Sequence, residues 1–587
     1  MDHRLLLYVF ISTFLLSSCS TTKTSREENY HLCPKVIVHS TIEFNLSQTE
    51  ERLICGDQEV SAYANIPSYQ ASFMLTSFLQ SRGYSVPRFE YENDLLHVYP
   101  GEISHLSSVV VISLEKDISK KIEEDIFRLH RKKVITPKLL NQIEVDALKM
   151  LRNNSFACAK VESTVDASEG VVTITLRQLD SYTFGTIEKE PIVGLNPKAL
   201  VRFYPFYDTD PFKEEEIQLA EKRFIREGIV QATYFQERCD NEKKDFKIYQ
   251  QFIPGLSRTI RFGIGANTEV GPMIRGRWAN QRSGEMASLL ETNIQAAFKY
   301  QNLNFTSERY LWENTPRQSF LLIFNLEHNE MLNFEEINMQ LKPHLKWTRD
   351  GRSRFWLWSV GPSFIGNMYA TDEDPNDTRK ITSIALEGRL HSKSHVYEFY
   401  DFHPEEGNYF DFNFDYRHPS LGFRSQLLKL DFSYLTLARF GNWGKGNAIG
   451  GFKAIAATTW ADNISQLSDL PPSVKYFGGG SEDIRGFKIG SLSGINGEGA
   501  LSKLVFKLEL RKTHFFIDTL ENFVFVDTGW LSEQSFKLDT QFWTSPGTGL
   551  RWLSPIGMVQ TYVALPFSNR DNYKDDLFFY LGLGGTF

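Results

Sequence analysis

The second half of the chain alternates between apolar and polar residues. From about residue 258 onward, segments of about ten residues each carry one apolar and one polar face. In residues 337–347 the apolar face holds Ile337, Met339, Leu341, Leu345 and Trp347. The intervening polar face holds Asn338, Gln340, Lys342, His344 and Lys346. This period of two predicts β-strands whose two faces meet different surroundings.

Other segments repeat the pattern. In residues 502–512 the apolar face holds Leu504, Phe506, Leu508 and Leu510, opposite Lys503, Lys507, Glu509 and Arg511. The last segment places Leu577, Phe579, Leu581, Leu583 and Phe587 on one side. We count about sixteen such segments in residues 256–587, an even number that can close into an antiparallel transmembrane β-barrel. A soluble β-sandwich gives a similar alternation, so the pattern alone leaves both folds open.

Two residue types divide the chain. Every tryptophan lies at Trp278 or later, and every cysteine lies at Cys239 or earlier. This change near residue 255 indicates a domain boundary. Tryptophan enrichment favours the membrane barrel, because tryptophan concentrates at membrane–water interfaces. The net charge of -8 gives no reason to expect a nucleic-acid partner.

The first half contains three similar α/β units, which repeat with a period of about seventy residues. We expect them at residues 35–101, 102–180 and 181–255. In each unit a helix ends at Gly or Asn before a β-prone run begins. The predicted order is strand, helix, helix, strand, strand. The opening strands are expected at 36–44, 108–114 and 183–188, and the closing strands at 95–99, 171–176 and 246–252.

The N-terminus is typical of an export signal. The apolar run Leu5 to Leu16 follows Arg4 and is too short to span a membrane as a helix. The run ends in Leu-Ser-Ser-Cys, which resembles a bacterial lipobox. We therefore expect residues 1–19 to be a lipoprotein-type signal peptide, Cys19 to be lipidated, and residues 20–34 to be a tether. The alternative is ordinary signal-peptidase cleavage nearby, with no role for Cys19.

The remaining cysteines are Cys33, Cys55, Cys158 and Cys239. An exported chain meets an oxidising compartment, where disulfides form. Three connectivities are open, and we expect Cys33 with Cys55 first, because both lie in the same small unit. The alternative is that the four cysteines are buried free thiols.

Residues 476–490, YFGGGSEDIRGFKIG, form the most distinctive stretch. Its three consecutive glycines, which include Gly479 and Gly480, exclude a regular helix or strand and predict a loop. The run Ile484-Arg485-Gly486-Phe487 then sets one permanent cation between apolar residues. A guanidinium can hold carboxylates through several charge-assisted hydrogen bonds. We expect this loop to fold inward and be pinned by Arg485, whereas the alternative is an ordinary surface loop.

Glycines also mark the first and last strands of the predicted barrel. The first contains Gly263 and Gly265, and the last contains Gly582, Gly584 and Gly585 ahead of Phe587. Glycine weakens a strand through backbone entropy and lost side-chain contacts. The seam between these strands is therefore expected to open more readily than others. The alternative is that the glycines only relieve crowding or let the barrel bend.

On these motifs the chain resembles the BamA/TamA superfamily (bacterial surface antigen family), most of all its TamA-type members. Residues 477–487 resemble the family's inward loop, whose core reads Val-Arg-Gly-Phe/Tyr. Residues 523–530, FVFVDTGW, resemble the strand that supplies an acidic lumen residue, here Asp527. Residues 547–567 and 260–278 resemble the penultimate and first hairpins. The α/β units resemble POTRA domains, and three of them match the TamA type better than the BamA type.

The resemblance implies an outer-membrane protein with α+β periplasmic POTRA repeats followed by an all-β transmembrane barrel of about 16 antiparallel strands. It also implies that Arg485 contacts acidic residues of the inner barrel wall, at the positions of Glu509 and Asp527. A lipobox departs from the TamA pattern.

The function implied is assembly or insertion of outer-membrane proteins through the barrel seam. Clients would bind the POTRA domains, whose sheet edges accept an added strand. The implied partners are the outer-membrane lipid bilayer, unfolded outer-membrane protein clients and a long TamB-like periplasmic protein.

Two other classes of function compete with this one. A two-partner-secretion export pore shares the loop motif, but it usually has fewer POTRA domains and a plugging helix before them. An enzyme would need a catalytic motif, and the chain has no nucleophile elbow, HExxH or P-loop. His391, His395 and Asp401 are too loosely spaced to indicate a site. We therefore expect no enzyme activity, no cofactor and no metal.

Overall fold

The structure is a computed structural model that describes residues 29–583 apart from 41, 58, 61–65, 114, 241–244, 372–373, 401–402, 445, 463–466, 495–496, 556 and 569–575. Cys19, Asp401, Gly584, Gly585 and Phe587 lie outside the described residues. The chain divides into two compact units at the Tyr182–Thr183 bond.

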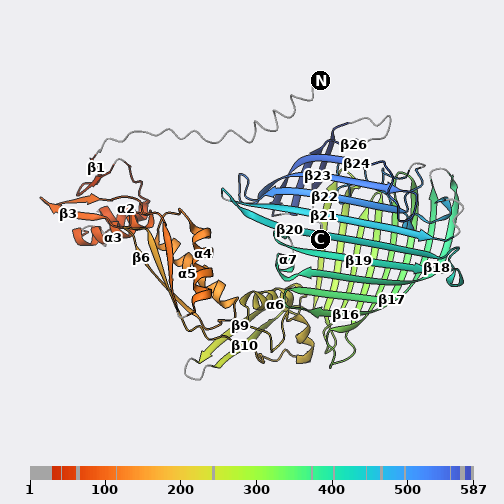
Figure 1. Ribbon diagram of the computed structural model, residues 1–587, viewed down its shortest axis with the longest axis horizontal. Helices are drawn as coiled ribbons and strands as arrows, with labels where there is room; N and C mark the ends of the chain where they lie inside the picture. The colour runs from red at the N-terminus through yellow and green to blue at the C-terminus, as the bar shows by residue number, and fades with distance from the viewer. Residues whose placement is uncertain are drawn as a thin grey trace. The chain divides into compact units, whose positions relative to one another are not determined.

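The N-terminal unit holds two small mixed sheets, each backed by two helices (Figure 1). The first has the strand order β1-β2-β4-β3 and the second β5-β7-β6. Its elements are β1 (Asn29–Cys33), β2 (Val36–His39), α2 (Gln48–Cys55), α3 (Ser68–Ser81), β3 (Arg88–Glu92), β4 (Leu95–Tyr99), β5 (Ser108–Ile112), α4 (Lys116–His130), α5 (Pro137–Arg152), β6 (Lys160–Asp166) and β7 (Val171–Arg177).

The helix α5 shows how the sequence sets these units. The Thr136 side chain accepts a hydrogen bond from the Leu139 backbone amide, and Pro137 occupies the first turn, where its missing N–H costs nothing. Its buried side chains recur every four residues, which places them on one face against the sheet. They are Leu139, Ile143, Ala147 and Leu151. This packing produces the predicted order of strands and helices.

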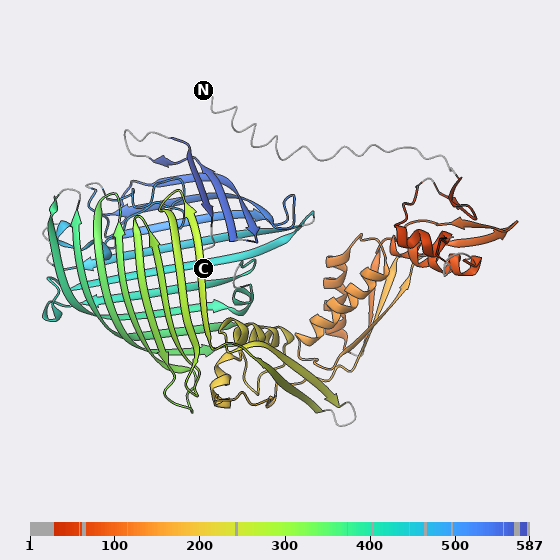
Figure 2. The same ribbon diagram turned by 180° about the vertical axis from the view of Figure 1, so that it is seen from behind.

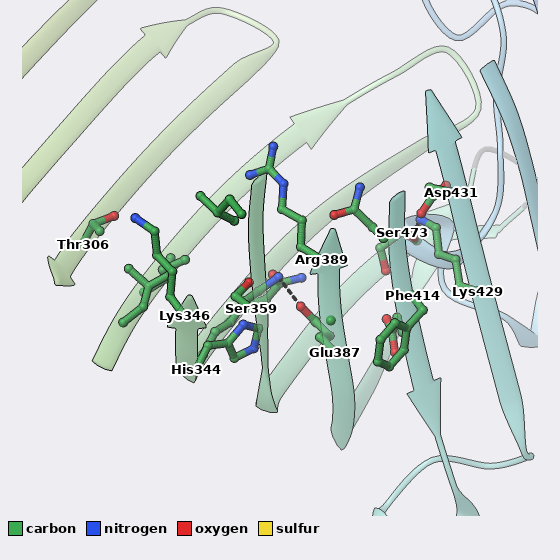
Figure 3. Close-up of a pocket in the computed structure, with 18 of the residues that line it drawn as sticks. Thr306, His344, Lys346, Ser359, Glu387, Arg389, Phe414, Lys429, Asp431 and Ser473 are labelled. Carbon is green, nitrogen blue, oxygen red and sulfur yellow. Dashed lines mark hydrogen bonds and ion pairs between the residues drawn. The ribbon is translucent and has the colours of Figure 1, made fainter. Parts of the chain in front are cut away.

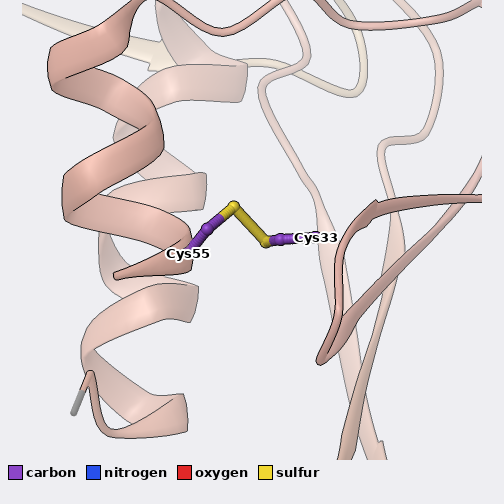
Figure 4. The surroundings of a disulfide bond; sticks show 2 residues. All are labelled: Cys33 and Cys55. Atoms are coloured by element: carbon purple, nitrogen blue, oxygen red, sulfur yellow. A yellow bond between two sulfur atoms is a disulfide. The ribbon is translucent and has the colours of Figure 1, made fainter. Parts of the chain in front are cut away.

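The first sheet contains a strand that was not predicted. β1 lies inside the stretch expected to be a tether, and it pairs antiparallel with β2. A disulfide joins Cys33, at the end of β1, to Cys55, at the end of α2 (Figure 4). The expected pairing of Cys33 with Cys55 is confirmed. The expectation that residues 29–34 form part of a tether is wrong, because the disulfide and the β1–β2 ladder hold them in the sheet.

The second unit begins with a third α/β element followed by the barrel. Its small sheet has the order β8-β10-β9. The elements are β8 (Glu188–Lys189), the 3-10 helix η2 (Pro197–Phe203), α6 (Glu214–Arg226), β9 (Val230–Asp240) and β10 (Asp245–Pro254). The strand predicted at 183–188 is mostly wrong, since Phe184 stacks on Phe206 at 3.6 Å between ring centroids and Gly185 takes a φ of 61°. That left-handed backbone cannot continue a strand.

The described residues from 258 to 583 form a closed barrel of sixteen strands, β11 to β25 and β27, with β26 as a two-residue extension (Figure 2). The strands are β11 (Arg258–Asn267), β12 (Gly271–Ser283), β13 (Ser288–Ala297), β14 (Tyr300–Arg309), β15 (Gln318–Glu330), β16 (Phe334–Asp350), β17 (Arg354–Thr371), β18 (Asp374–Ser394), β19 (Gly407–Arg417), β20 (Leu427–Trp443), β21 (Gly446–Ala461), β22 (Ser502–Lys512), β23 (Leu520–Ser532), β24 (Trp543–Ser554), β25 (Gly557–Ala564), β26 (Phe567–Ser568) and β27 (Phe578–Leu583). Short helices α7 (His395–Phe399), η3 (Pro419–Leu421), η4 (Leu467–Asp469) and η5 (Pro472–Val474) lie in its connections.

The alternating side chains of the strands point outward and inward, as expected for a membrane barrel. On β16, Leu345 is 43% exposed on the outside, whereas the neighbouring His344 is 5% exposed on the inside. On β22, Leu508 is 55% exposed while the side chain of Lys507 is 11% exposed. An apolar outer face and a charged inner face are the arrangement that a lipid surrounding requires. The predicted fold of α/β repeats followed by a barrel of about sixteen antiparallel strands is confirmed. Within the described part of the chain, no helix is long and apolar enough to cross a membrane.

Candidate functional site

Part of the connection between β21 and β22, whose described residues are 462, 467–494 and 497–501, lies inside the barrel. It starts at the end of the barrel away from the third α/β unit, which we call the far end. Its side chains meet residues from separate parts of the wall: Phe477 contacts Phe334 at the start of β16, and Ser481 contacts Glu269 between β11 and β12. A single loop can reach both only through the lumen of a closed barrel. We call this segment the inward loop.

Arg485 is the centre of the inward loop. Its Nε lies 2.7 Å from Asp527 Oδ2, and its Nη2 donates to Asp527 Oδ1 at 2.8 Å. Its backbone N–H also donates to Asp527, at 3.0 Å, and Nη1 donates to Glu509 Oε2 at 2.7 Å. The side chains of Arg485 and Asp527 are 5% and 0% exposed. The structure thus brings together the three charged residues that the sequence singled out, in a bidentate and buried arrangement.

Apolar and glycine residues fix the position of Arg485. Its guanidinium carbon lies 3.7 Å from the centroid of the Phe525 ring, so the cation also meets an aromatic face. Ile484 and Phe487 on either side are buried in an apolar cluster with Val505 and Trp543. Gly486 has a φ of 93°, and a Cβ there would come within 2.2 Å of the Ser545 hydroxyl. Only glycine lets the backbone approach the wall this closely.

The start of the inward loop forms a tight turn. The Gly479 amide donates to Asp483 Oδ2 at 3.0 Å, and the Gly480 amide donates to the Phe487 carbonyl at 2.9 Å. The Asp483 carboxylate also forms an ion pair with Lys503 of β22, with Oδ1 and Nζ 2.8 Å apart. These bonds close the turn so that Arg485 points at the wall rather than into the lumen.

The wall compensates the charges of the cluster. Lys507 Nζ lies 3.6 Å from Asp527 Oδ2 and donates to the Ser481 carbonyl at 3.2 Å. Arg551 Nη2 lies 3.5 Å from Glu509 Oε1. Every carboxylate around Arg485 therefore has more than one cationic neighbour. We expect the network to hold β22, β23, β24 and the inward loop in one register.

Glu269 is a contact that the sequence did not predict. It lies in the turn between β11 and β12, and its carboxylate accepts the Ser481 backbone N–H at 2.6 Å and the Ser481 hydroxyl at 2.9 Å. The inward loop is thereby joined to the far end of the first hairpin. An acidic residue in a barrel turn is common, so no signal in the sequence could have identified this partner 212 residues away.

The contact leads to a prediction. Replacing Glu269 by Ala removes two charge-assisted hydrogen bonds, which we expect to loosen the far end of β11 by roughly 1–3 kcal/mol. Hydrogen exchange of the β11 amides should then quicken, while exchange in β13 and β14 stays unchanged. Glu330→Ala, at the far end of β15, is the matched control. Unchanged exchange in β11 would contradict a role for Glu269 in holding the hairpin.

The seam joins β11 to β27. β27 pairs with β25 along its full described length, from Phe578 opposite Ala564 to Leu583 opposite Val559. On its other side the described residues give only Ala266 opposite Leu583 and Asn267 opposite Gly582. The stretch Phe578–Leu581 runs past the end of β11 and meets only the turn, where the Thr268 amide donates to the Leu581 carbonyl at 3.1 Å.

The structure describes three of the seam glycines, Gly263, Gly265 and Gly582. Gly263 and Gly265 lie opposite Arg275 and Met273 of β12, and Gly582 lies opposite Asn267. The outward side chains of the same stretch of β11 are strongly exposed: Ile260 is 65%, Phe262 85% and Ile264 84% exposed. The outer face of the first strand is therefore bulky and apolar, and it lies close to the β11–β27 junction, where the described strands form only two residue pairs.

The rest of the lumen holds a cavity of about 540 Å³ between β14 and β20 (Figure 3). Charged residues line it, and they pair with one another: Lys342 with Glu387 at 2.7 Å, and Lys346 with Glu308 at 2.8 Å. Such a wall suits water, because charges of both signs are interspersed along it. No cluster of three or more His, Cys, Asp or Glu side chains placed to hold a metal ion occurs among the described residues.

The chain matches one protein-family model and several solved structures. Residues 392–587 match the model of the Omp85 superfamily domain. Among solved structures, BamA from Haemophilus ducreyi lacking POTRA domains 1-3 is 14% identical, with a TM-score of 0.50 over 82% of this chain and 99% of that one. CdiB from Acinetobacter baumannii is 12% identical, with a TM-score of 0.47 over 82% and 89% of the two chains. CdiB from Escherichia coli is 12% identical, with a TM-score of 0.48 over 86% and 94%. At this identity the likeness to BamA concerns the fold.

Proposed function

We propose that this chain, whose C-terminal part is an Omp85 superfamily domain, assembles other outer-membrane proteins and inserts them into the bilayer through the seam between β11 and β27. The protein lies in the bacterial outer membrane, with its N-terminal units in the periplasm. A barrel of this superfamily transports or inserts proteins and is not an enzyme. The barrel end that carries the third α/β unit is therefore periplasmic, and the far end faces the outside.

The observation that carries the proposal is the unequal pairing of β27. One edge of this strand is fully paired with β25, whereas the described part of the other edge pairs only through Gly582 and Leu583. Unpaired backbone N–H and C=O groups cannot be satisfied by lipid, so such an edge is stable only when another strand can add to it. A client strand satisfies it and leaves a new edge for the next strand.

The inward loop supports the same function. It is fixed to β22 and β23 through Arg485 and to the first hairpin through Glu269, so it bridges both sides of the seam from inside the lumen. We infer that the loop keeps the wall in register while the seam exchanges partners. The α/β units would receive clients on sheet-edge strands such as β3 and β6. A TamB-like periplasmic protein is a further proposed partner, and Cys19 a proposed lipid anchor.

A direct experiment uses purified full-length protein in liposomes. An unfolded outer-membrane barrel protein is added, and its folding is followed by protease resistance and heat-modifiable migration. We expect faster folding than in empty liposomes or in liposomes that carry an unrelated porin. Equal folding in all three would contradict the proposal.

The lumen cavity favours a second candidate, an export pore of the two-partner-secretion type. Its paired charges could accommodate a passing hydrophilic chain. The same liposomes distinguish the two functions: a pore delivers a soluble substrate to the opposite side of the membrane and leaves the folding of barrel proteins unaffected.

A further inference from the structure

The connection between β18 and β19 is unlike the other connections at the periplasmic end. The β16–β17 connection spans only residues 351–353, whereas this one runs from 395 to 406 and includes the helix α7. Figures 1 and 2 both show α7 at the end of the barrel where α6 lies. We use its described parts, residues 395–400 and 403–406, and call them the mouth segment.

The mouth segment reaches strands far from its own. Glu405 Oε2 accepts a hydrogen bond from the Arg439 guanidinium of β20 at 2.7 Å and another from the Asn447 side-chain amide of β21 at 3.0 Å. The Pro404 carbonyl accepts a hydrogen bond from the Arg511 guanidinium of β22. His403 Nε2 lies 2.6 Å from Glu521 Oε1 of β23. A connection between neighbouring strands that touches β20 to β23 must run across the opening of the barrel.

The other end of the mouth segment is bound to the third α/β unit. Arg223 of α6 donates to Glu398 of α7 at 3.0 and 2.8 Å and to Asp350 of β16 at 2.8 Å. The exposures of the three side chains are 4%, 2% and 0%. Lys222 of α6 adds a hydrogen bond of 2.7 Å to the Phe399 carbonyl. One buried guanidinium thus joins α6, α7 and the rim of the barrel.

The charges around Glu398 favour its ionised form. Burial by itself would raise the pKa of Glu398, but the attraction of Arg223 and Lys393 outweighs burial and holds the pKa well below its ordinary value. Arg226 lies 3.1 Å from the same carboxylate. Removing Arg223 would leave two buried carboxylates, Glu398 and Asp350, without their shared partner. Such a loss is strongly destabilising for the contact between α6 and α7.

We propose that the mouth segment closes the periplasmic opening of the barrel and that Arg223 of the third α/β unit holds it in place. Loss of the Arg223–Glu398 pair releases the mouth segment at α7, and the released segment no longer closes the lumen. The contacts given above join the mouth segment to α6 and to β20–β23, and the Arg223 guanidinium also contacts β16, whereas the seam lies between β11 and β27.

The test measures ion conductance of the purified full-length protein in planar lipid bilayers. We expect a low conductance for the unaltered protein and a several-fold rise for Arg223→Gln and for Glu398→Gln. Because the two residues act as one pair, the double variant should conduct no more than either single variant. Arg439→Gln, which frees the opposite end of the mouth segment without touching α6, should also raise conductance.

Arg177→Gln is the matched control, because Arg177 forms an ion pair with Glu162 whose side chains are 62% and 59% exposed. It should conduct like the unaltered protein. Heat-modifiable migration confirms that each variant retains a folded barrel. Unaltered conductance in folded Arg223→Gln and Arg439→Gln, or an equal rise in Arg177→Gln, would overturn the proposal. Client assembly is not the readout, so this result does not depend on the proposed function.

Discussion

Replacing Arg485 by Ala is expected to destabilise the barrel by roughly 3–5 kcal/mol. The substitution removes every side-chain bond that Asp527 and Glu509 receive from the inward loop. Asp527 is fully buried, and its nearest remaining cation, Lys507, lies 3.6 Å away. Lys507 alone cannot replace the two guanidinium bonds, and the carboxylate cannot regain water at this depth, so the wall must distort or the loop must leave the lumen.

Thermal unfolding of the purified protein, followed by heat-modifiable migration, measures this effect. Arg389→Ala is the matched control: Arg389 also pairs with a wall carboxylate, Asp411, but its side chain is 53% exposed, so the cost should stay below about 1 kcal/mol. Arg485→Lys should recover only part of the stability, because an ammonium cannot bridge both oxygens of Asp527 in one plane. A folded Arg485→Ala protein that melts with the control would refute the assignment of Arg485 as an internal brace.

The sequence predicted the barrel well because each strand residue faces either lipid or lumen. That choice appears directly in the alternation, as Leu508 outside and Lys507 inside illustrate. The inward loop was predicted in a different way. The glycines and the lone arginine indicate only a loop that carboxylates could hold, and Glu509 and Asp527 were assigned as its partners by the resemblance to the family's loop and strand motifs.

Contacts that depend on how distant segments meet could not be predicted. The pair of Arg223 and Glu398 spans 175 residues, and in the sequence Arg223 is one of several charged residues on an amphipathic helix. Its burial follows only from the docking of α6 on the barrel rim. The short β8 has a different cause: Phe184 is β-prone, but packing against Phe206 and Phe212 outweighs that propensity.

A disulfide across the seam is expected to abolish assembly activity. Ala266 and Leu583 lie opposite each other in the β11–β27 ladder, so cysteines at these two positions can form a covalent link between the strands. If clients pair with the freed edges of β11 and β27, the locked protein can no longer offer those edges. Oxidised Ala266→Cys/Leu583→Cys protein in liposomes should therefore fold clients no faster than empty liposomes do, and reduction should restore the rate.

The control places the same link where no opening is expected. Asn293 and Asn304 lie opposite each other across β13 and β14, strands that pair along most of their length. Asn293→Cys/Asn304→Cys carries an equal number of new cysteines and an equal covalent constraint, so it should assemble clients at the unaltered rate. Inhibition by both pairs would mean that the barrel must flex as a whole. Full activity of the oxidised seam pair would exclude the seam as the route, whereas inhibition by that pair alone assigns client insertion to the junction between the first and last strands.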